Sequence, residues 1–357
     1  MGFYQVYSGF KDKKFEELPS AISDRKLKDF FELLTLDAEV NLEELALAAH
    51  ELTLRFFGKT VQLYTPMYLS NYCSNPCVYC GFNVKNNIER KKLSLDEVEA
   101  EARFISSTGL KHILILTGES RKETPPEYIK DCVQLLKKYF SSISIEVYPL
   151  DESEYAMLVS EGVDGLTIYQ EAYDEKVYEM VHPSGPKKNY LFRLDAPERG
   201  AGVGMRSVNI GVLLGLTDWR KEVFILGLHA RYLQDKFPDV EIGVSLPRIQ
   251  PQVSGFKPAC NVTDKNLVQI ILSLRLFLGR LGISLSTREN AALRENLIPV
   301  GITRISAGST TNVGGHTQAV QHEAAQFFIQ DKRSVMEIKK MIEGKGYQPV
   351  LKDWMAI

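Results

Sequence analysis

The chain has 357 residues, 44% of them hydrophobic, which is enough for one large barrel or two ordinary domains with a substantial core. Its 43 Lys and Arg against 45 Asp and Glu give a net charge of -2, so there is no overall field to attract nucleic acid or an anionic membrane. We expect a cytoplasmic protein, because no signal-peptide core opens the chain and Arg275 and Arg280 interrupt its richest apolar run.

The first sixty residues have the pattern of helices. Apolar residues recur at three-to-four spacing in 25–34 and 41–58, and Gly58 is a typical helix stop. We interpret residues 1–60 as an N-terminal helical extension, which is either a lid or a packing element.

From residue 61 the pattern changes to eight β-rich runs that alternate with segments of about helix length. The clearest helix start is the capping box Ser94 to Glu97. We therefore predict a (β/α)8 barrel over 61–310 and a C-terminal extension, 311–357, packed on it. A doubly wound open sheet is the rival fold, but it needs a glycine-rich turn after its first strand, where this chain has cysteines. The predicted strands are 61–69, 112–119, 142–150, 165–171, 207–216, 241–249, 283–289 and 302–309.

Chemistry in parallel barrels gathers where strands end and loops begin, so the polar residues at these ends are candidates for a site. We do not assign a catalytic role to any histidine. The strand-end candidates are Tyr68 with the cysteines, Thr117-Gly118-Glu119, Glu146 with Tyr148, Gln170-Glu171, Gly211 to Gly215, Arg248, Thr287-Arg288-Glu289, and Ser306 to Thr310.

Three cysteines, Cys73, Cys77 and Cys80, lie within eight residues directly after the first predicted strand. Structural zinc needs a fourth ligand, and neither His112 nor Cys132 is suitably placed. A redox pair would use Cys77 and Cys80 and leave Cys73 idle. A cubane iron–sulfur cluster accepts three thiolates from one loop and leaves one iron without a protein ligand, so we favour this interpretation.

The stretch YLSNYCSNPCVYCGF, with Tyr79 before the last cysteine, resembles the radical S-adenosylmethionine (SAM) superfamily. The resemblance implies one 4Fe–4S cluster whose open iron is chelated by the amino and carboxylate groups of SAM. An electron then cleaves SAM to methionine and a 5′-deoxyadenosyl radical. A low-potential electron donor of flavodoxin or ferredoxin type is implied as well.

Further motifs resemble the aromatic amino acid lyases, and among them the 2-iminoacetate synthases, the tyrosine lyases of thiamine biosynthesis. This resemblance runs from about residue 60 to the end and implies cleavage of the Cα–Cβ bond of L-tyrosine to 2-iminoacetate and p-cresol. It also implies a thiazole synthase partner. The motifs are LTGES, YQEAY, VNIGVLLGLTDWR, RIQP, LSTRE, ISAGSTTNVGGH, QFFIQDKRS and PVLKDW.

The same resemblance implies contacts with SAM. Gly118 and Glu119 match the glycine-glutamate element after the second strand, where Thr117 replaces the usual first glycine. Glu171 and Arg193 match charged residues that contact SAM. A solvated carboxylate, a surface ion pair and strand packing are the alternative interpretations. The expected cofactor contacts are Tyr79, Gly118, Glu119, Glu171, Arg193 and Gly211.

Arg288, at the end of the seventh strand, is the residue we expect to bind the substrate carboxylate. A planar guanidinium grips a carboxylate through two charge-assisted hydrogen bonds, each worth about 1.5–3 kcal/mol. A structural pair with Glu289 is the alternative interpretation. The candidate substrate residues are Arg288, Arg248 as a second anchor, Ser306, Ser309 and Tyr68.

Several rival functions stay open at this point. A tryptophan lyase differs only in the pocket for the side chain. The hydrogenase-maturation tyrosine lyase carries a second cluster domain, which we do not expect because no cysteine follows Cys260. An enzyme of FO-synthase type is a minor alternative. Outside enzymes, an iron–sulfur scaffold or regulator would need no SAM pocket.

Overall fold

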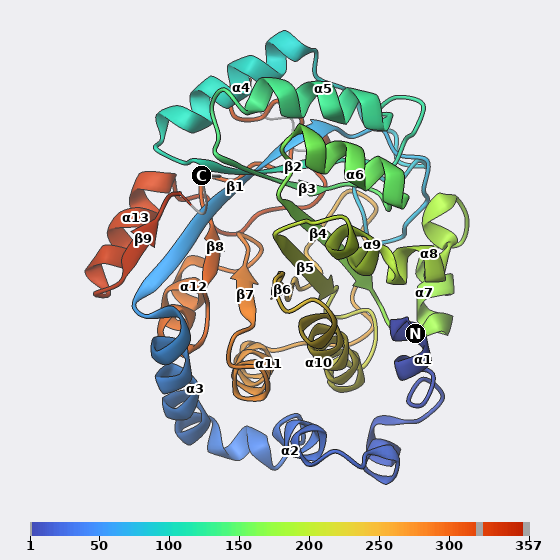
Figure 1. Cartoon of the computed structure of the whole chain (residues 1–357), viewed down its shortest axis with the longest axis vertical. Coiled ribbons are helices and arrows are strands. Elements are labelled where there is room, and N and C mark those ends of the chain that lie inside the picture. Colours follow the sequence, from blue (N-terminus) through green and yellow to red (C-terminus); the bar gives the residue numbers. More distant parts are fainter. Residues whose placement is uncertain (1, 319–323, 353–357) are drawn as a thin grey trace.

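Strands β1 to β8 form a closed parallel barrel, which confirms the expected (β/α)8 fold (Figure 1). In the computed structural model, which describes residues 2–318 and 324–352, the strands follow one another around the ring and β1 pairs with β2 to close it. An open, doubly wound sheet is therefore excluded. The barrel strands are β1 Thr60–Ser70, β2 His112–Thr117, β3 Ser142–Glu146, β4 Gly165–Glu171, β5 Ser207–Val212, β6 Glu241–Ser245, β7 Gly282–Leu285 and β8 Arg304–Ser306.

Helices alternate with these strands around the outside of the barrel (Figure 1). The predicted capping box begins α4, where the Ser94 hydroxyl accepts from the Glu97 N–H and the Glu97 carboxylate accepts from the Ser94 N–H. The barrel helices are α4 Leu95–Ser107, α5 Pro126–Leu136, α6 Glu152–Glu161, α7 Glu175–Val181, η3 Pro186–Lys188, α8 Tyr190–Leu194, α9 Ala196–Gly202, α10 Trp219–Lys236, α11 Asp264–Phe277, α12 Ala291–Leu297 and η4 Ile298–Val300.

Strand β2 shows why apolar runs without polar alternation become barrel strands. Ile113 and Ile115 pack into the main core with the helices, whereas Leu114 and Leu116 face the inside of the barrel. Both faces of a parallel strand are buried, so both must be apolar. The residues that follow Leu116 therefore emerge at the mouth of the barrel.

The N-terminal extension packs on the outer helices and does not act as a lid. The Phe30 ring stacks on Phe277 of α11 with centroids 4.2 Å apart, and the Gln269 side chain donates to the carbonyls of Leu33 and Thr35. None of the described residues before Tyr64 lines the cavity at the barrel mouth. The helices of this part are α1 Phe3–Tyr7, η1 Phe15–Ala21, α2 Arg25–Leu33, η2 Ala38–Asn41 and α3 Leu42–Phe57.

The C-terminal part contains a helix, α13 Val335–Gly344, and a ninth strand, β9 Gln348–Val350, which pairs with the start of β1. Before α13, the chain crosses the mouth of the barrel, where the Gly81 N–H donates to the Gln326 carbonyl at 2.9 Å. The division at 60/61 and 310/311 stays a prediction. Asp353 and Trp354 of the PVLKDW motif lie outside the described residues. Among the described helices, none is long and apolar enough to cross a membrane.

Candidate active site

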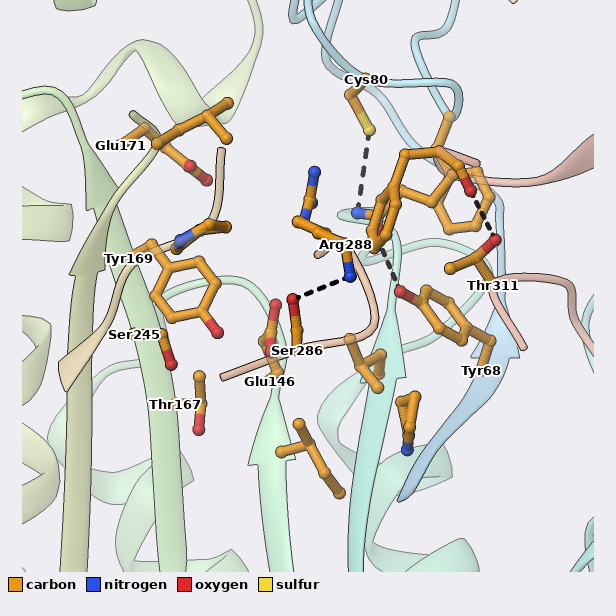
Figure 2. A pocket seen from close by; sticks show the side chains of 18 of the residues that line it. Tyr68, Cys80, Glu146, Thr167, Tyr169, Glu171, Ser245, Ser286, Arg288 and Thr311 are labelled. Atoms are coloured by element: carbon orange, nitrogen blue, oxygen red, sulfur yellow. Dashed lines mark hydrogen bonds between the residues drawn. The ribbon is translucent and has the colours of Figure 1, made fainter. Parts of the chain in front are cut away.

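One cavity at the C-terminal ends of the barrel strands collects nearly all the predicted site residues (Figure 2). Arg248 and Gly211 are the exceptions, because neither lines it. The predicted residues that line the cavity are Tyr68, Cys73, Cys77, Tyr79, Cys80, Gly118, Glu119, Glu171, Arg193, Arg288, Ser306 and Ser309.

The cysteine loop is held in place by Arg90. Its guanidinium donates to the backbone carbonyls of Asn71, Phe82 and Asn83 at 2.7, 2.9 and 2.6 Å. The Asn83 side chain in turn donates to the Cys77 carbonyl at 3.0 Å. A loop without regular secondary structure thus has its carbonyl groups satisfied and a fixed shape.

The three thiols suit an iron–sulfur cluster better than a single metal ion. Within residues 2–318 and 324–352, no three His, Cys, Asp or Glu side chains form a group arranged to hold a metal ion. A cubane takes one thiolate at each of three iron corners, so its ligands need to surround it rather than converge on one point. Burial raises the pKa of the Cys77 thiol to about 12 and that of Cys80 to about 11. Cluster binding must therefore release protons from them.

Asn75 connects the cysteine loop to the loop that follows β2. Its side-chain amide donates to the Glu119 carboxylate at 2.6 Å, and its carbonyl oxygen accepts from the Lys187 N–H at 2.9 Å. The Ser74 N–H also donates to the Glu119 carbonyl at 2.8 Å. Two hydrogen bonds from the cysteine loop thus fix Glu119 beside the thiols.

Gly118 allows this close approach, because a Cβ at this position would lie 2.3 Å from the Tyr72 carbonyl oxygen. We expect Gly118→Ala to displace the cysteine loop, to lower the free energy of unfolding by about 1–3 kcal/mol and to reduce iron content. Urea unfolding and iron analysis measure both effects. In the control Gly202→Ala, the new Cβ meets nothing within 4 Å, so full iron content is expected. Normal stability and iron in Gly118→Ala would show that the loop tolerates the shift.

Glu171 is a buried carboxylate in a strained backbone. Its φ is 70°, a left-handed value that costs a residue with a side chain roughly 1–3 kcal/mol and is typical of functional sites. The Lys187 ammonium lies 2.7 Å and the Arg193 guanidinium 3.7 Å from its carboxylate. Burial alone would raise the pKa of Glu171, but these two cations hold it below the ordinary value, so the group is ionised at neutral pH.

Arg288 presents its guanidinium to the cavity. The group stacks on Phe327, 3.4 Å from the ring centroid, and its strongest polar contact is a 3.5 Å hydrogen bond to the Arg248 carbonyl. None of the carboxylates in the described part of the chain forms an ion pair with it. The alternative interpretation, a pair with Glu289, does not apply, because Glu289 binds Arg248.

Arg248 forms ion pairs with two carboxylates of the protein itself. Its Nε lies 3.0 and 3.1 Å from the two carboxylate oxygens of Glu289, and its Nη2 lies 2.8 Å from Asp264. Glu289 is only 2% exposed, so its charge needs this partner. We therefore correct the expectation that Arg248 is a second substrate anchor.

Gly211 also differs from expectation. A Cβ there would lie 2.7 Å from both the Ser245 carbonyl oxygen and the Tyr169 ring. The small residue makes room for other parts of the protein, so its glycine reflects strand packing. Leu213, two residues further on, lines the cavity instead.

The polar groups of Tyr68, Ser306 and Ser309 differ in their availability. The Tyr68 hydroxyl donates to the Gln326 side chain at 2.7 Å, and the Ser306 hydroxyl accepts from the Thr287 N–H at 3.0 Å. The Ser309 hydroxyl is buried and has no hydrogen-bond partner among the described residues. Ser309 is therefore the only one of these three hydroxyls without a hydrogen-bond partner in the described part of the chain.

Besides Thr311, which directly follows the predicted stretch Ser306 to Thr310, two residues of the C-terminal part line the cavity and were not predicted. The Gln326 side chain accepts from the Tyr68 hydroxyl and donates weakly to the Cys80 sulfur at 3.9 Å, while the Phe327 ring stacks on the Arg288 guanidinium. Their only signal in the sequence is the QFFIQDKRS motif, which follows no barrel strand. A search for polar residues at the ends of predicted strands therefore does not find them.

A closed (β/α)8 barrel with three cysteines at its mouth defines a radical SAM enzyme, and the sequence profile of the Radical SAM superfamily matches residues 67–226. That of the Biotin and Thiamin Synthesis associated domain matches residues 245–348. The 2-iminoacetate synthase of Escherichia coli (strain K12) is 38% identical over 328 residues, which cover 91% of this chain and 86% of that protein. The chain belongs to the 2-iminoacetate synthase family. It is a radical SAM carbon–carbon lyase with a 4Fe–4S cluster and SAM as cofactors.

Solved structures agree with this assignment. The FeFe-hydrogenase maturase HydG from Carboxydothermus hydrogenoformans is 31% identical, with a TM-score of 0.83 over 98% of this chain and 82% of that chain. Methylornithine synthase is 22% identical, with a TM-score of 0.74 over 94% of this chain and 97% of that chain, and shares the fold.

Proposed function

We propose that the protein cleaves the Cα–Cβ bond of L-tyrosine to 2-iminoacetate and p-cresol and supplies thiazole formation in thiamine biosynthesis. The single observation that carries this proposal is the 38% identity over 91% of the chain to a protein named 2-iminoacetate synthase. The match to the Biotin and Thiamin Synthesis associated domain supports the pathway. A thiazole synthase would receive the iminoacetate, which hydrolyses readily in water.

The cavity residues support distinct roles in this proposal. Cys73, Cys77 and Cys80 would hold three corners of the cluster. Arg288 would bind the substrate carboxylate, since its guanidinium faces the cavity and is free of ion pairs within the described part of the chain. The Ser309 hydroxyl would donate to the same end of the substrate. The expected SAM contacts that line the cavity are Tyr79, Gly118, Glu119, Glu171 and Arg193.

When bound, the cluster and SAM would supply a carbon-centred radical able to remove a hydrogen atom from the substrate amine. Cleavage of the Cα–Cβ bond then leaves 2-iminoacetate and a 4-hydroxybenzyl fragment, which needs one electron and one proton to become p-cresol. The low-potential donor of flavodoxin or ferredoxin type would provide the electron. Arg288 keeps the amine within reach, because hydrogen transfer requires reacting atoms about 3–3.5 Å apart.

Product analysis under strict anaerobiosis tests the proposal. The protein with its cluster reconstituted is mixed with dithionite, SAM and either L-tyrosine or L-tryptophan. We expect p-cresol, 5′-deoxyadenosine and glyoxylate, the hydrolysis product of 2-iminoacetate, to form with tyrosine. Deoxyadenosine that forms only with tryptophan would contradict the proposal and indicate a tryptophan lyase.

Two other results would also reject it. Carbon monoxide and cyanide released from tyrosine would indicate the hydrogenase-maturation reaction. Absence of SAM cleavage with every amino acid, in protein that carries a full cluster, would favour an iron–sulfur scaffold.

A further inference from the structure

Glu146 is a carboxylate at the end of β3 for which neither the cluster nor the expected SAM contacts provide a use. Its side chain lines the same cavity as Arg288, and Figure 2 labels both residues. It forms no hydrogen bond or ion pair with the rest of residues 2–318 and 324–352. An unpaired carboxylate inside a protein is costly. Its position therefore indicates that a bound ligand provides the partner that no side chain of the described residues provides.

The surroundings of Glu146 are mixed in charge. Burial raises the pKa of its carboxyl to about 7, the nearby Glu171 adds to the rise, and Arg288 opposes it. The charged and titratable groups that face it are Glu171 and Tyr169 from β4, Arg288 from the loop after β7, Arg193 from α8, Lys187 from η3, and Tyr64 and Tyr68 from β1.

This position suits one group of an amino acid substrate. Arg288 is the proposed anchor for the carboxylate, and Glu171 and Arg193 are proposed SAM contacts. Glu146 is near Arg288 on one side and near Glu171 and Arg193 on the other, so it faces the space between the two proposed binding positions. In an α-amino acid, the ammonium nitrogen is bonded to the same carbon as the carboxylate, so this nitrogen would lie in that space. We propose, on the basis of the proposed function, that Glu146 pairs with the substrate α-ammonium group and accepts one of its protons.

The step balances without an oxidant or reductant. One N–H bond breaks with both electrons left on nitrogen, and the proton forms an O–H bond on the Glu146 carboxylate. The products are a neutral amine and a neutral carboxyl group. The reaction benefits because hydrogen-atom removal from a neutral amine leaves a neutral aminyl radical, whereas removal from an ammonium group would leave a radical cation. A base whose pKa is near the working pH is best suited to this transfer.

Equilibrium binding to the protein with cluster and SAM, but without reductant, tests the ammonium contact. The probes are L-tyrosine, L-phenylalanine and 3-(4-hydroxyphenyl)propionate, which lacks the ammonium group. We expect the wild type to bind tyrosine about 10- to 100-fold more tightly than the propionate, as for a charged hydrogen bond. Glu146→Gln should lose most of this preference, and Glu146→Asp should keep part of it.

A matched control is Glu222→Gln. Glu222 is likewise buried, with a pKa that burial raises to about 7, but it accepts from the N–H groups of Tyr173 and Asp174 and does not line the cavity. It should keep the wild-type preference. Retained preference in Glu146→Gln would overturn the proposal. So would weaker binding of tyrosine alone with phenylalanine unchanged, because that result would place Glu146 at the phenol.

The pH dependence gives a second readout. Glu146 must be ionised to accept a proton, so kcat/KM of the wild type should fall as pH drops below about 7. Glu146→Gln should lack this acid limb, and Glu222→Gln should keep it. An acid limb that persists in Glu146→Gln would contradict the proposal.

The binding test needs no turnover, so its result does not depend on whether the proposed function is correct. If the protein were a tryptophan lyase, the same effect of Glu146→Gln would appear with tryptophan and indole-3-propionate.

Discussion

Replacing Cys77 by alanine should remove the iron–sulfur cluster and all SAM cleavage. Cys77 is 5% exposed and lies in the loop that Arg90 fixes, so no flexible neighbour can take its place. A cubane held by three thiolates loses one of its corners, and a methyl group cannot bind iron. Iron and acid-labile sulfide, measured on anaerobically reconstituted protein, should fall to background, and 5′-deoxyadenosine should not form.

The other two cysteines provide the controls. Cys132 is fully buried in α5, and Cys260 is partly exposed in the loop before α11. Neither lines the cavity, so Cys132→Ala and Cys260→Ala should retain full iron content. Cys132→Ala should unfold more easily, because it leaves a small hole in the core. A complete cluster in Cys77→Ala would mean that Cys77 is not a required ligand, and it would contradict the assignment of three corners to Cys73, Cys77 and Cys80.

The sequence predicts the barrel well because parallel strands leave a strong local pattern. Each strand is buried on both faces, so short apolar runs separated by helix-length segments have few other solutions. The strand-end rule then places Glu119, Glu171 and Arg288 in one cavity although they are far apart in the chain. This part of the site follows from topology alone.

The C-terminal segment is harder to predict, because its place depends on contacts between distant residues. Gln326 meets Tyr68 and Cys80 across about two hundred and fifty positions of sequence, and no strand or helix pattern marks it. Strand β9 is three residues long and pairs with β1 only at its edge. Such short elements have no periodicity to detect.

Arg248 and Arg288 illustrate the limit for single side chains. Each arginine lies three residues after the end of a barrel strand, Arg248 after β6 and Arg288 after β7. Their positions in the sequence therefore do not distinguish their roles. Residues 286–289 form a turn in which the Glu289 N–H donates to the Ser286 carbonyl, and the Glu289 carboxylate pairs with Arg248 and not with its neighbour Arg288. Only the fold reveals which arginine is neutralised and which faces the cavity.

Replacing Arg288 by alanine should weaken tyrosine binding strongly and leave the cluster intact. The two charge-assisted hydrogen bonds that Arg288 offers a carboxylate are worth about 1.5–3 kcal/mol each, so the KM for tyrosine should rise by about 100-fold or more. Because the amine would no longer be held in reach of the radical, kcat should fall too. Arg288→Lys keeps the charge but not the planar arrangement of donors, so its KM and kcat should lie between those of the wild type and Arg288→Ala.

Tyramine, which lacks the carboxylate, shows whether the loss arises at this contact. Wild-type protein should bind tyrosine more tightly than tyramine, and Arg288→Ala should bind both equally, with normal iron content. Arg280→Ala, which removes an exposed arginine that does not line the cavity, should behave as wild type. If Arg288→Ala kept the preference for tyrosine, the carboxylate would have to bind elsewhere. Glu146 would then face another part of the substrate, because its proposed role depends on the ammonium group lying beside Arg288.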